Sequence, residues 1–334
     1  MENPVLVEVT RGDLVESFHR GAFALVEADG RVVASAGDIE RPVFPRSAIK
    51  VFQGLQLIES GAADRFELSQ EELSLACASH SGEPEHVRLA AGMLAKAGLG
   101  ETRLECGCHW PFDLPVALDL ARSGETPGPL HNNCSGKHAG FLCTAVHLGE
   151  ETAGYVSAAH PVQARAREAI EDLTGATLGA DVCGTDGCSI PTYAAPLRGF
   201  AKGFAKLVSG QGVEASRSAA GKRLIEACMA EPFAMSGTKR ACAALMDAAP
   251  GRVFAKTGAE GVFCGAIPEL GLGFALKIDD GTTRASEALV AAVVARAFAD
   301  ADAGLAETYR EMGFKTLRNW EKTEVGAIRP VLDA

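Results

Sequence analysis

The sequence lacks the features that direct a chain to a membrane or to nucleic acid. Its first residues, MENPVLVEVTRG, have neither the basic segment nor the apolar core of a signal peptide. No apolar run approaches the roughly 20 residues that span a bilayer. The formal net charge is −11, whereas nucleic acids and anionic membranes bind basic surfaces. We therefore expect a cytoplasmic protein with neither nucleic acid nor a membrane as partner.

Internal repeats and low-complexity segments are absent as well. The 334 residues are 47% hydrophobic, which is enough for one large core or for two closely packed domains. The composition by itself therefore predicts an acidic globular protein and nothing more specific.

Cysteine, in contrast, is numerous, with ten residues. Without an export signal, reduced thiols are the default, and most should be small buried hydrophobic side chains. That interpretation suits the cysteines in apolar or helical segments, which are Cys77, Cys143, Cys228, Cys242 and Cys264. Cys134, Cys183 and Cys188 lie among Gly, Asn and Asp, and they require another explanation.

Short apolar runs near both ends of the sequence predict strands. An Asp29-Gly30 turn between two apolar runs predicts a hairpin in the first group. Three runs late in the chain predict antiparallel strands. The predicted strands are 5–9, 18–27, 31–36, 252–256, 262–267 and 273–277. The tail, 315–334, is predicted to be irregular or to form one edge strand.

Most of the sequence between these two groups of strands has patterns that predict helices. Residues 106–133 are the exception, because their prolines predict a loop-rich segment. A long amphipathic helix is predicted after the last strands. The predicted helices are 47–60, 85–97, 139–148, 162–174, 193–207, 214–229, 237–247 and 284–302.

Ser47 and Lys50 begin the first helix, in the segment PRSAIKVFQGLQLIES. Residues three apart share a helix face, so the hydroxyl and the amine would be neighbours. Such a pair can act as nucleophile and base if burial or nearby positive charge keeps the lysine neutral. The alternative is an N-cap serine followed by a solvated lysine, which a lone SxxK motif favours.

Lys256-Thr257-Gly258, on the first strand of the late group, strengthens the catalytic interpretation. An SxxK that opens a helix, followed by a KTG on a strand, is the arrangement of serine β-lactamases and penicillin-binding proteins. Lys256 would then approach Ser47 and depress the pKa of Lys50. The third element of that pattern, Ser-Asp-Asn, is absent, and Ser79 or Ser135 could replace its serine.

We therefore predict one catalytic domain over residues 1–334, of the α/β (α+β) class and with a serine β-lactamase-like fold. Strands at about 5–36 and 252–278 would form one antiparallel sheet, which helices flank. Residues at about 47–247 would form a mostly helical lobe, and the active-site cleft would lie between lobe and sheet.

Two polar loops carry cysteines that the β-lactamase pattern does not use. Cys134 and Lys137 lie in LHNNCSGKHAG, which leads into a helix N-terminus of the kind that binds anionic groups. Cys188 lies in DVCGTDGCSIP. Two cysteines in separate loops could hold a zinc ion, but they are fewer than in the usual structural sites, and lysine is an uncommon ligand. Spacing alone therefore favours structural thiols over a metal.

With these motifs together, the sequence resembles the Rhizobium-type (class 3) L-asparaginases, also called the asparaginase II family. The resemblance runs from the N-terminal strands to the C-terminal helix, and five blocks carry it: PRSAIKVFQ, ASHSGE, HNNCSGKHAGFL, DGCSIP and KTGAEGVF. Members of that family have a β-lactamase-like fold, hydrolyse L-asparagine to L-aspartate and ammonia, and form dimers. The resemblance implies an L-asparaginase that acts as a homodimer.

By position, the resemblance implies two catalytic pairs, Ser47 with Lys50 and Ser79 with Lys256. Our hypothesis is that Ser47 attacks the side-chain amide with Lys50 as base, while Ser79 and Lys256 relay the proton to the departing ammonia. The two serines could exchange these roles. The resemblance also implies a zinc near the substrate, and it places residues around both ligands. These are Cys134, Lys137 and Cys188 on the metal, Asp186 on the α-amino group, and Arg46 and His138 lining the pocket.

Two other functions stay open. One is another serine amidohydrolase of the same fold, such as a glutaminase, a peptidase or a β-lactamase. The other is a non-catalytic, zinc-dependent amino-acid-binding protein, against which the joint presence of two serines and two lysines argues. Relative turnover of the candidate substrates separates the first from an asparaginase, and binding without ammonia release would support the second.

Overall fold

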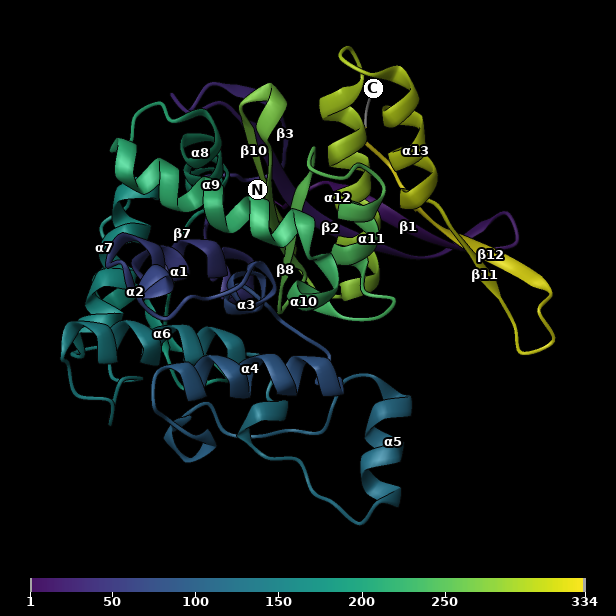
Figure 1. The fold of residues 1–334 in the computed structure, drawn as a ribbon. Coiled ribbons are helices and arrows are strands. Elements are labelled where there is room, and N and C mark those ends of the chain that lie inside the picture. The colour runs from purple at the N-terminus through teal and green to yellow at the C-terminus, as the bar shows by residue number, and fades with distance from the viewer. Residues whose placement is uncertain (1, 333–334) are drawn as a thin grey trace.

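The computed structural model describes residues 2–332, and its centre is an eight-stranded sheet (Figure 1). The strands follow the order β11-β12-β1-β2-β10-β9-β8, with β3 also beside β2. All strand pairs in this sheet are antiparallel. The strands are β1 (Val5–Arg11), β2 (Leu14–Val26), β3 (Val32–Ala36), β8 (Phe254–Gly258), β9 (Val262–Ile267), β10 (Leu272–Ile278), β11 (Lys315–Arg318) and β12 (Glu324–Pro330).

The longest strand, β2, connects the strands near the start of the chain with those near its end. Its first half pairs with β1, and its second half pairs with β3 on one side and with β10 on the other. The predicted hairpin is confirmed: Gly30 has a φ of 93°, which glycine adopts without a steric penalty, and its N–H donates to the Glu27 carbonyl. The predicted union of early and late strands in one antiparallel sheet is also confirmed.

Residues beyond the third late strand differ from the prediction. The helix predicted over 284–302 ends at Phe298, and a second helix follows because the Asp302 carboxylate accepts the Leu305 N–H as an N-cap. These helices are α12 (Thr283–Phe298) and α13 (Ala303–Gly313). The tail forms two strands, β11 and β12, and so the prediction of irregular chain or a single strand was wrong. Residues 333–334 of that prediction lie outside the described residues.

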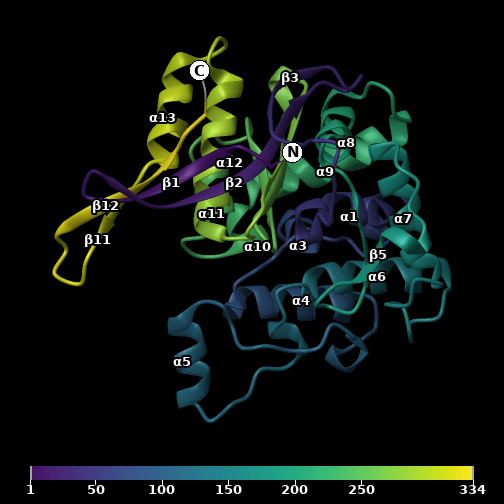
Figure 2. The same ribbon diagram turned by 180° about the vertical axis from the view of Figure 1, so that it is seen from behind.

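The lobe between the two groups of strands is mostly helical, as predicted (Figures 1 and 2). The segment 106–133, predicted to be loop-rich, contains one helix, α5, none of whose residues is buried. The helices are α1 (Lys50–Glu59), α2 (Ala62–Arg65), α3 (Gln70–Ala76), α4 (Pro84–Lys96), α5 (Leu114–Arg122), α6 (Ser135–Leu148), α7 (Pro161–Thr174), α8 (Leu197–Ser209), α9 (Ala215–Ala230), α10 (Pro232–Ser236) and α11 (Ala241–Asp247). The helix predicted over 193–207 begins later because short strands precede it, β6 (Pro191–Tyr193) and β7 (Ala195–Pro196).

Helices cover the sheet from both sides. Six of the seven residues of β10 are buried, because α8 packs against one face of the strand and α12 against the other (Figure 1). Within the lobe, five helices surround α1 and α6, which are themselves buried along most of their length: α2, α3, α4, α7 and α9. Strand β8 forms the edge of the sheet next to this lobe, and the candidate site lies at that junction.

Candidate active site

Ser47 and Lys50 lie where the chain enters the helical lobe. A short 3-10 turn, Arg46–Ile49, leads directly into α1, so Ser47 lies in the turn before the α-helix, which begins three residues later than predicted. Lys50 has no exposed surface, whereas Ser47 is half-buried. Arg46 has a φ of 51°, an uncommon backbone conformation for a residue other than glycine, and one that is frequent at functional sites.

The hydroxyl of Ser79 lies between two lysine amines. Lys256 Nζ is 2.8 Å from Ser79 Oγ, and Lys50 Nζ is 3.1 Å from the same oxygen. The three residues come from the loop after α3, from the start of α1 and from β8, and all of them are buried. Lys50 also donates to the carbonyl of Ala78 and lies 3.1 Å from Cys134 Sγ.

The two predicted serine–lysine pairs therefore differ in the structure. Ser79 and Lys256 are joined by a hydrogen bond. Lys50 points to Ser79, and no hydrogen bond within residues 2–332 joins Lys50 to the hydroxyl of Ser47. Ser135, the other serine considered for the third motif, bonds instead to His80, with Oγ and Nε2 2.9 Å apart.

Burial changes the proton affinity of Lys256. Loss of solvent lowers the pKa of its amine to about 7, with Lys50 lowering it further and Cys242 acting in the opposite direction. A substantial fraction of this amine is therefore neutral near pH 7. A neutral lysine 2.8 Å from a serine hydroxyl can accept the proton of that hydroxyl.

The KTG motif also brings β8 against the turn that carries Ser47. A Cβ atom on Gly258 would lie 2.5 Å from the Pro45 carbonyl oxygen, so only glycine allows this approach. The SxxK turn and the KTG strand thus meet at the edge of the sheet, beside the helical lobe. This arrangement confirms the serine β-lactamase-like fold that the sequence predicts.

Two sulfur atoms and a third lysine form the next group. Cys134 precedes the first residue of α6, Lys137 lies in its first turn, and Cys188 lies between β5 (Cys183–Thr185) and β6. Lys137 Nζ is 3.0 Å from Cys188 Sγ, and all three side chains are buried. Cys183 lies outside this group. The residue is half-buried, and its sulfur lies 3.7 Å from the carbonyl oxygen of Gly184.

The pKa values of the two thiols in this group are shifted in opposite directions. A hydrogen bond from Cys188 holds the pKa of Cys134 well below its usual value, against the effect of burial and with help from Lys50. The same hydrogen bond and burial raise the pKa of Cys188. Burial opposes the charge on Lys137, but the two sulfur atoms and Asp186 raise its pKa by more. Cys134 is therefore the more acidic of the two thiols.

The three predicted substrate-binding residues surround these groups. Arg46 Nε donates to Asp186 Oδ1 at 2.6 Å, and Asp186 Oδ2 lies 3.8 Å from Cys188 Sγ. Burial raises the pKa of Asp186, but Lys137 and Arg46 lower it by more, so the carboxylate is ionised. His138 is fully buried, and burial together with Lys137 and Lys50 holds its pKa well below the usual value.

Sequence reasoning missed one residue at the site. Tyr155 is fully buried, and its hydroxyl lies 2.7 Å from His138 Nδ1. The segment around Tyr155 carries no periodic pattern and no motif, so only the fold brings this side chain to His138. The ten predicted residues themselves all come to the junction of α1, α6, β8 and the β5–β6 loop.

The side chains that could bind a metal here differ from the usual ligand sets. Within residues 2–332, no three His, Cys, Asp or Glu side chains form a group that could hold a metal ion. Lys137 is therefore needed beside Cys134 and Cys188 if a zinc binds here. Two sulfurs and one amine are buried together and within hydrogen-bond distance of one another or of Lys50, and sulfur and nitrogen donors suit zinc.

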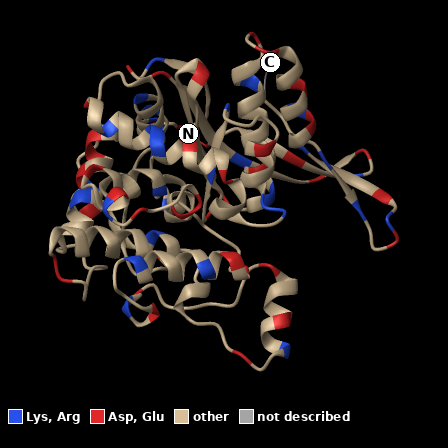
Figure 3. Cartoon of the chain, viewed as in Figure 1, with Lys and Arg blue, Asp and Glu red and all other residues tan. Residues whose placement is uncertain are grey.

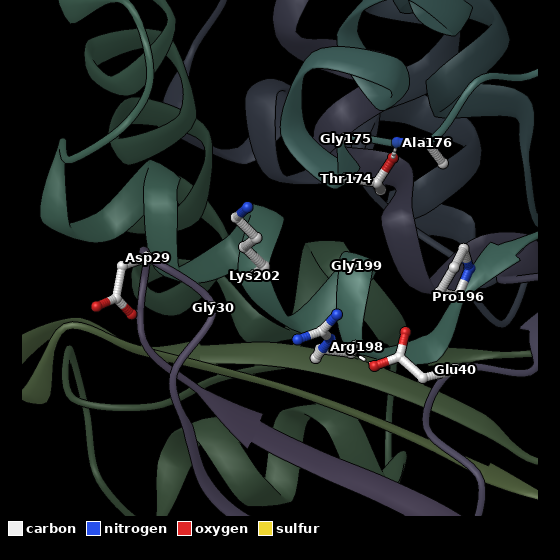
Figure 4. A pocket seen from close by; sticks show the side chains of 10 residues that line it. All are labelled: Asp29, Gly30, Glu40, Thr174, Gly175, Ala176, Pro196, Arg198, Gly199 and Lys202. Carbon is white, nitrogen blue, oxygen red and sulfur yellow. Dashed lines mark hydrogen bonds and ion pairs between the residues drawn. The ribbon is translucent and has the colours of Figure 1, made fainter.

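One cavity in the part of the chain that the structure describes contains none of these residues. A cavity of about 440 Å³ lies between the β2–β3 turn, the end of α7 and the start of α8, where Arg198 pairs with Glu40 and Lys202 points into open space (Figure 4). Acidic and basic residues both occur along the sheet and along the helical lobe (Figure 3). In residues 2–332, no helix has the length and apolar character needed to cross a bilayer.

Of the comparisons with known proteins, one shows the family. The chain is similar to a solved structure of a β-lactamase from Mycobacterium bovis, with 14% identity and a TM-score of 0.40 over 83% of this chain and 94% of that one. It is similar to Mglu in its native form with 17% identity and a TM-score of 0.38, over 89% of this chain and 68% of that one. It is also similar to a LovD6 mutant of simvastatin synthase from Aspergillus terreus, with 11% identity and a TM-score of 0.42 over 87% of this chain and 93% of that one. These values are too low to support an argument about function, and no curated protein matches the chain. The sequence profile described as L-asparaginase II, however, matches residues 7–330, so the chain belongs to the L-asparaginase II family and is an amidohydrolase.

Proposed function

We propose that the protein is an L-asparaginase, which hydrolyses L-asparagine to L-aspartate and ammonia. The observation that carries this proposal is the serine hydroxyl of Ser79 held between the buried amines of Lys50 and Lys256. One of these amines has a pKa of about 7, which is suited to proton transfer at neutral pH. The membership of the L-asparaginase II family supports an amide as the substrate.

In the proposed reaction, Ser47 attacks the side-chain amide carbon and Lys50 takes its proton. Ser79 and Lys256 pass a proton to the departing ammonia, and water then hydrolyses the aspartyl ester. Backbone N–H groups at the start of α1, including that of Ser47, would hold the oxyanion. The contact between Lys50 and Ser79 supports a continuous route for the proton from one pair to the other.

The opposite assignment of the serines has one observation in its favour. Ser79 has two amine neighbours, whereas the hydrogen bonds of Lys50 do not include Ser47. Catalytic hydrogen bonds often form only once the substrate is bound, so the distances in the free enzyme do not decide between the two serines. The serine variants described below do.

Asp186 would bind the α-amino group of the substrate, with Arg46 and His138 lining the pocket. The carboxylate is ionised and is already bonded to Arg46 through Oδ1. Its other oxygen can accept a hydrogen bond from an ammonium group. Arg46 would remain beside the substrate and would suit its α-carboxylate.

A zinc ion would be held by Cys134, Lys137 and Cys188, with Lys137 giving up its proton to become a ligand. Three protein ligands leave a fourth position open, as in catalytic zinc sites. A bound zinc would supply positive charge that orients the substrate. The lowered pKa of Cys134 supports this proposal, because the thiolate is the form of cysteine that binds metal.

The first experiment measures ammonia release from L-asparagine and L-glutamine, before and after chelation, with zinc counted per chain. We expect rapid turnover of L-asparagine and about one zinc per chain. Turnover of L-glutamine or of a chromogenic β-lactam in preference to L-asparagine would contradict the proposed substrate. Binding of L-asparagine by calorimetry without ammonia release would contradict the proposed catalysis and would support an amino-acid-binding protein.

Serine variants then test the catalytic assignment. Ser47→Ala and Ser79→Ala should each lower kcat by about a thousandfold or more, and only the variant that keeps the nucleophile should still form an acyl-enzyme. Ser74→Ala is the matched control, because Ser74 is a buried serine of α3 whose hydroxyl bonds to the Glu231 carbonyl, away from the site. Near-normal turnover in Ser47→Ala and Ser79→Ala alike would rule out this mechanism.

We also propose a homodimer, on the family resemblance, which light scattering would test.

A further inference from the structure

The ring of His138 has one partner in the structure, and that partner is Tyr155. His138 Nδ1 lies 2.7 Å from the Tyr155 hydroxyl oxygen. The other ring nitrogen, Nε2, is buried and has no hydrogen-bond partner within residues 2–332. Buried polar atoms without a partner are rare in folded proteins, and each one calls for an explanation.

The hydrogen bonds of Tyr155 decide which nitrogen carries the proton. Its hydroxyl oxygen accepts the backbone N–H of Glu105 at 2.9 Å. The hydroxyl proton then needs an acceptor, and within residues 2–332 His138 Nδ1 is the one within reach. Nδ1 is consequently unprotonated, and the proton of the neutral ring lies on Nε2.

The opposite tautomer would leave more groups unsatisfied. If Nδ1 carried the proton and donated it to Tyr155, the tyrosine hydroxyl proton would have no acceptor. The Nε2 lone pair would also have no donor, so two buried groups would be unpaired. With the proton on Nε2, a single N–H remains unpaired, and a ligand that offers an oxygen atom can satisfy it.

The ring of His138 lies close to two lysines of the proposed active site. His138 follows Cys134 by one turn of α6, so the two residues share a face of that helix. Lys50 and Lys137 are close enough to His138 to oppose a positive charge on its ring. The ring stands edge-on to Tyr155, with an interplanar angle of 75°, which fixes its orientation.

We infer that Tyr155 is a positioning residue: it holds His138 as the Nε2–H tautomer, so that the ring donates a hydrogen bond to a carboxylate oxygen of the substrate. The same tautomer has no lone pair on Nε2, so His138 would not be a zinc ligand. The kinetic part of this inference rests on the proposed function, whereas the tautomer does not.

The tautomer can be observed directly in protein labelled with 15N-histidine. Correlation spectra of the ring nitrogens distinguish protonated from unprotonated positions, and His138→Gln identifies the signals of His138 among the eight histidines. We expect a protonated Nε2 and an unprotonated Nδ1 in the wild-type protein, and a mixture of tautomers in Tyr155→Phe. A protonated Nδ1 in the wild-type protein would overturn the inference.

Kinetics then separate positioning from general stability. Tyr155→Phe should raise KM for L-asparagine about fivefold, the usual effect of losing one hydrogen bond, and change kcat by less than about twofold. Tyr309→Phe is the matched control, because it also removes a buried hydroxyl bond, from Tyr309 to the Leu245 carbonyl. An unchanged KM in Tyr155→Phe, or an equal rise in Tyr309→Phe, would refute the positioning role.

A double variant completes the test. In His138→Gln, the glutamine amide can donate from a similar place without help from Tyr155, so adding Tyr155→Phe should raise KM no further. A further rise as large as in the wild-type background would mean that Tyr155 acts through packing alone. If the wild-type protein releases no ammonia from L-asparagine, the proposed function fails, and the nitrogen spectra still decide the tautomer.

Discussion

Three lysine side chains, Lys50, Lys137 and Lys256, are buried within one small region of this protein. Lysine is almost never fully buried without a partner, because removing its charge from water costs free energy. Here each amine has a hydroxyl or a sulfur atom as its neighbour. At the scale of single residues, the site thus depends on where the protons of these amines lie.

Lys256 provides a prediction about pH. Because burial lowers its pKa to about 7, the amine is charged below that pH and neutral above it. If Lys256 must accept a proton, kcat/KM should fall about tenfold for each pH unit below 7 and level off above it. The measurement is a pH profile of ammonia release at low substrate concentration.

Lys256→Arg is the companion variant, because arginine keeps its charge throughout this pH range. It should lose most of the activity and show no rise through pH 7. A wild-type profile that is flat between pH 6 and pH 8 would contradict the role of Lys256.

The residue types at the site could be predicted from the sequence, but their partners could not. The motifs indicate that Ser47, Lys50, Ser79 and Lys256 belong to one site. Helical spacing predicts that Lys50 faces Ser47, yet the amine bonds to Ser79 and to the Ala78 carbonyl. A lysine side chain is long enough to reach several neighbours, so its partner depends on the packing of α3 and β8, which local spacing does not describe.

At the scale of elements, the approach of α6 to α3 places the metal-binding candidates. A Cβ atom on Gly136 would lie 2.3 Å from the Leu75 carbonyl oxygen, so the start of α6 touches the backbone of α3. Cys134 and Lys137 flank Gly136 in the sequence. The contact between these two helices therefore fixes the position of both side chains.

Gly136→Ala should disrupt this contact. The added methyl group has no room, so we expect a loss of about 1–3 kcal/mol in the free energy of unfolding and a clear loss of activity. Gly140→Ala, on the same helix, is the control, because its Cβ would meet Leu57 and Ala76 at ordinary distances of 3.4 and 3.5 Å. That variant should be as stable as the wild type or about 1 kcal/mol more stable. Denaturant unfolding and ammonia release measure both effects, and equal behaviour of the two variants would contradict this account.

The elements that the sequence predicts well are those with a local signal. An Asp-Gly turn marks the β2–β3 hairpin, and proline or glycine marks the ends of several helices. In contrast, α5 has no buried face, and the hairpin of β11 and β12 is attached to the sheet through the pairing of β12 with β1. Their stability comes from neighbours distant in the sequence or is slight, so composition and periodicity do not indicate them.

At the scale of the whole molecule, strands from both ends of the chain complete one sheet. β12 pairs with β1 through Val7–Pro330, Glu8–Arg329 and Val9–Ile328. Helix α12 packs against both of these strands. The C-terminal hairpin is therefore part of the core structure, although the sequence predicted it as irregular chain or a single edge strand.

A chain that stops at Gly313 should be unstable for this reason. Loss of β11 and β12 would leave the outer edge of β1 unpaired and would remove the buried side chain of Ile328 from the core. Exposed strand edges promote aggregation. We expect a lower thermal midpoint and large assemblies in light scattering. Trp320→Ser is the control, because this side chain is 98% exposed and should change stability by less than about 0.5 kcal/mol. A truncated chain with the size and melting behaviour of the full chain would contradict the prediction.

The pairing of β1 with β12 also bears on how the protein is made. Glu8 and Arg329, whose side chains bond across these strands, are 321 positions apart in the sequence. A ribosome that adds roughly 5–20 residues per second needs on the order of 16 to 64 seconds to make the intervening chain. During that time the hydrogen-bonding groups on the outer edge of β1 have no β12 to pair with, while local helices of the lobe can already form. The nascent chain therefore displays an unpaired strand edge throughout that interval, which is the period when a chaperone would be of most use to it.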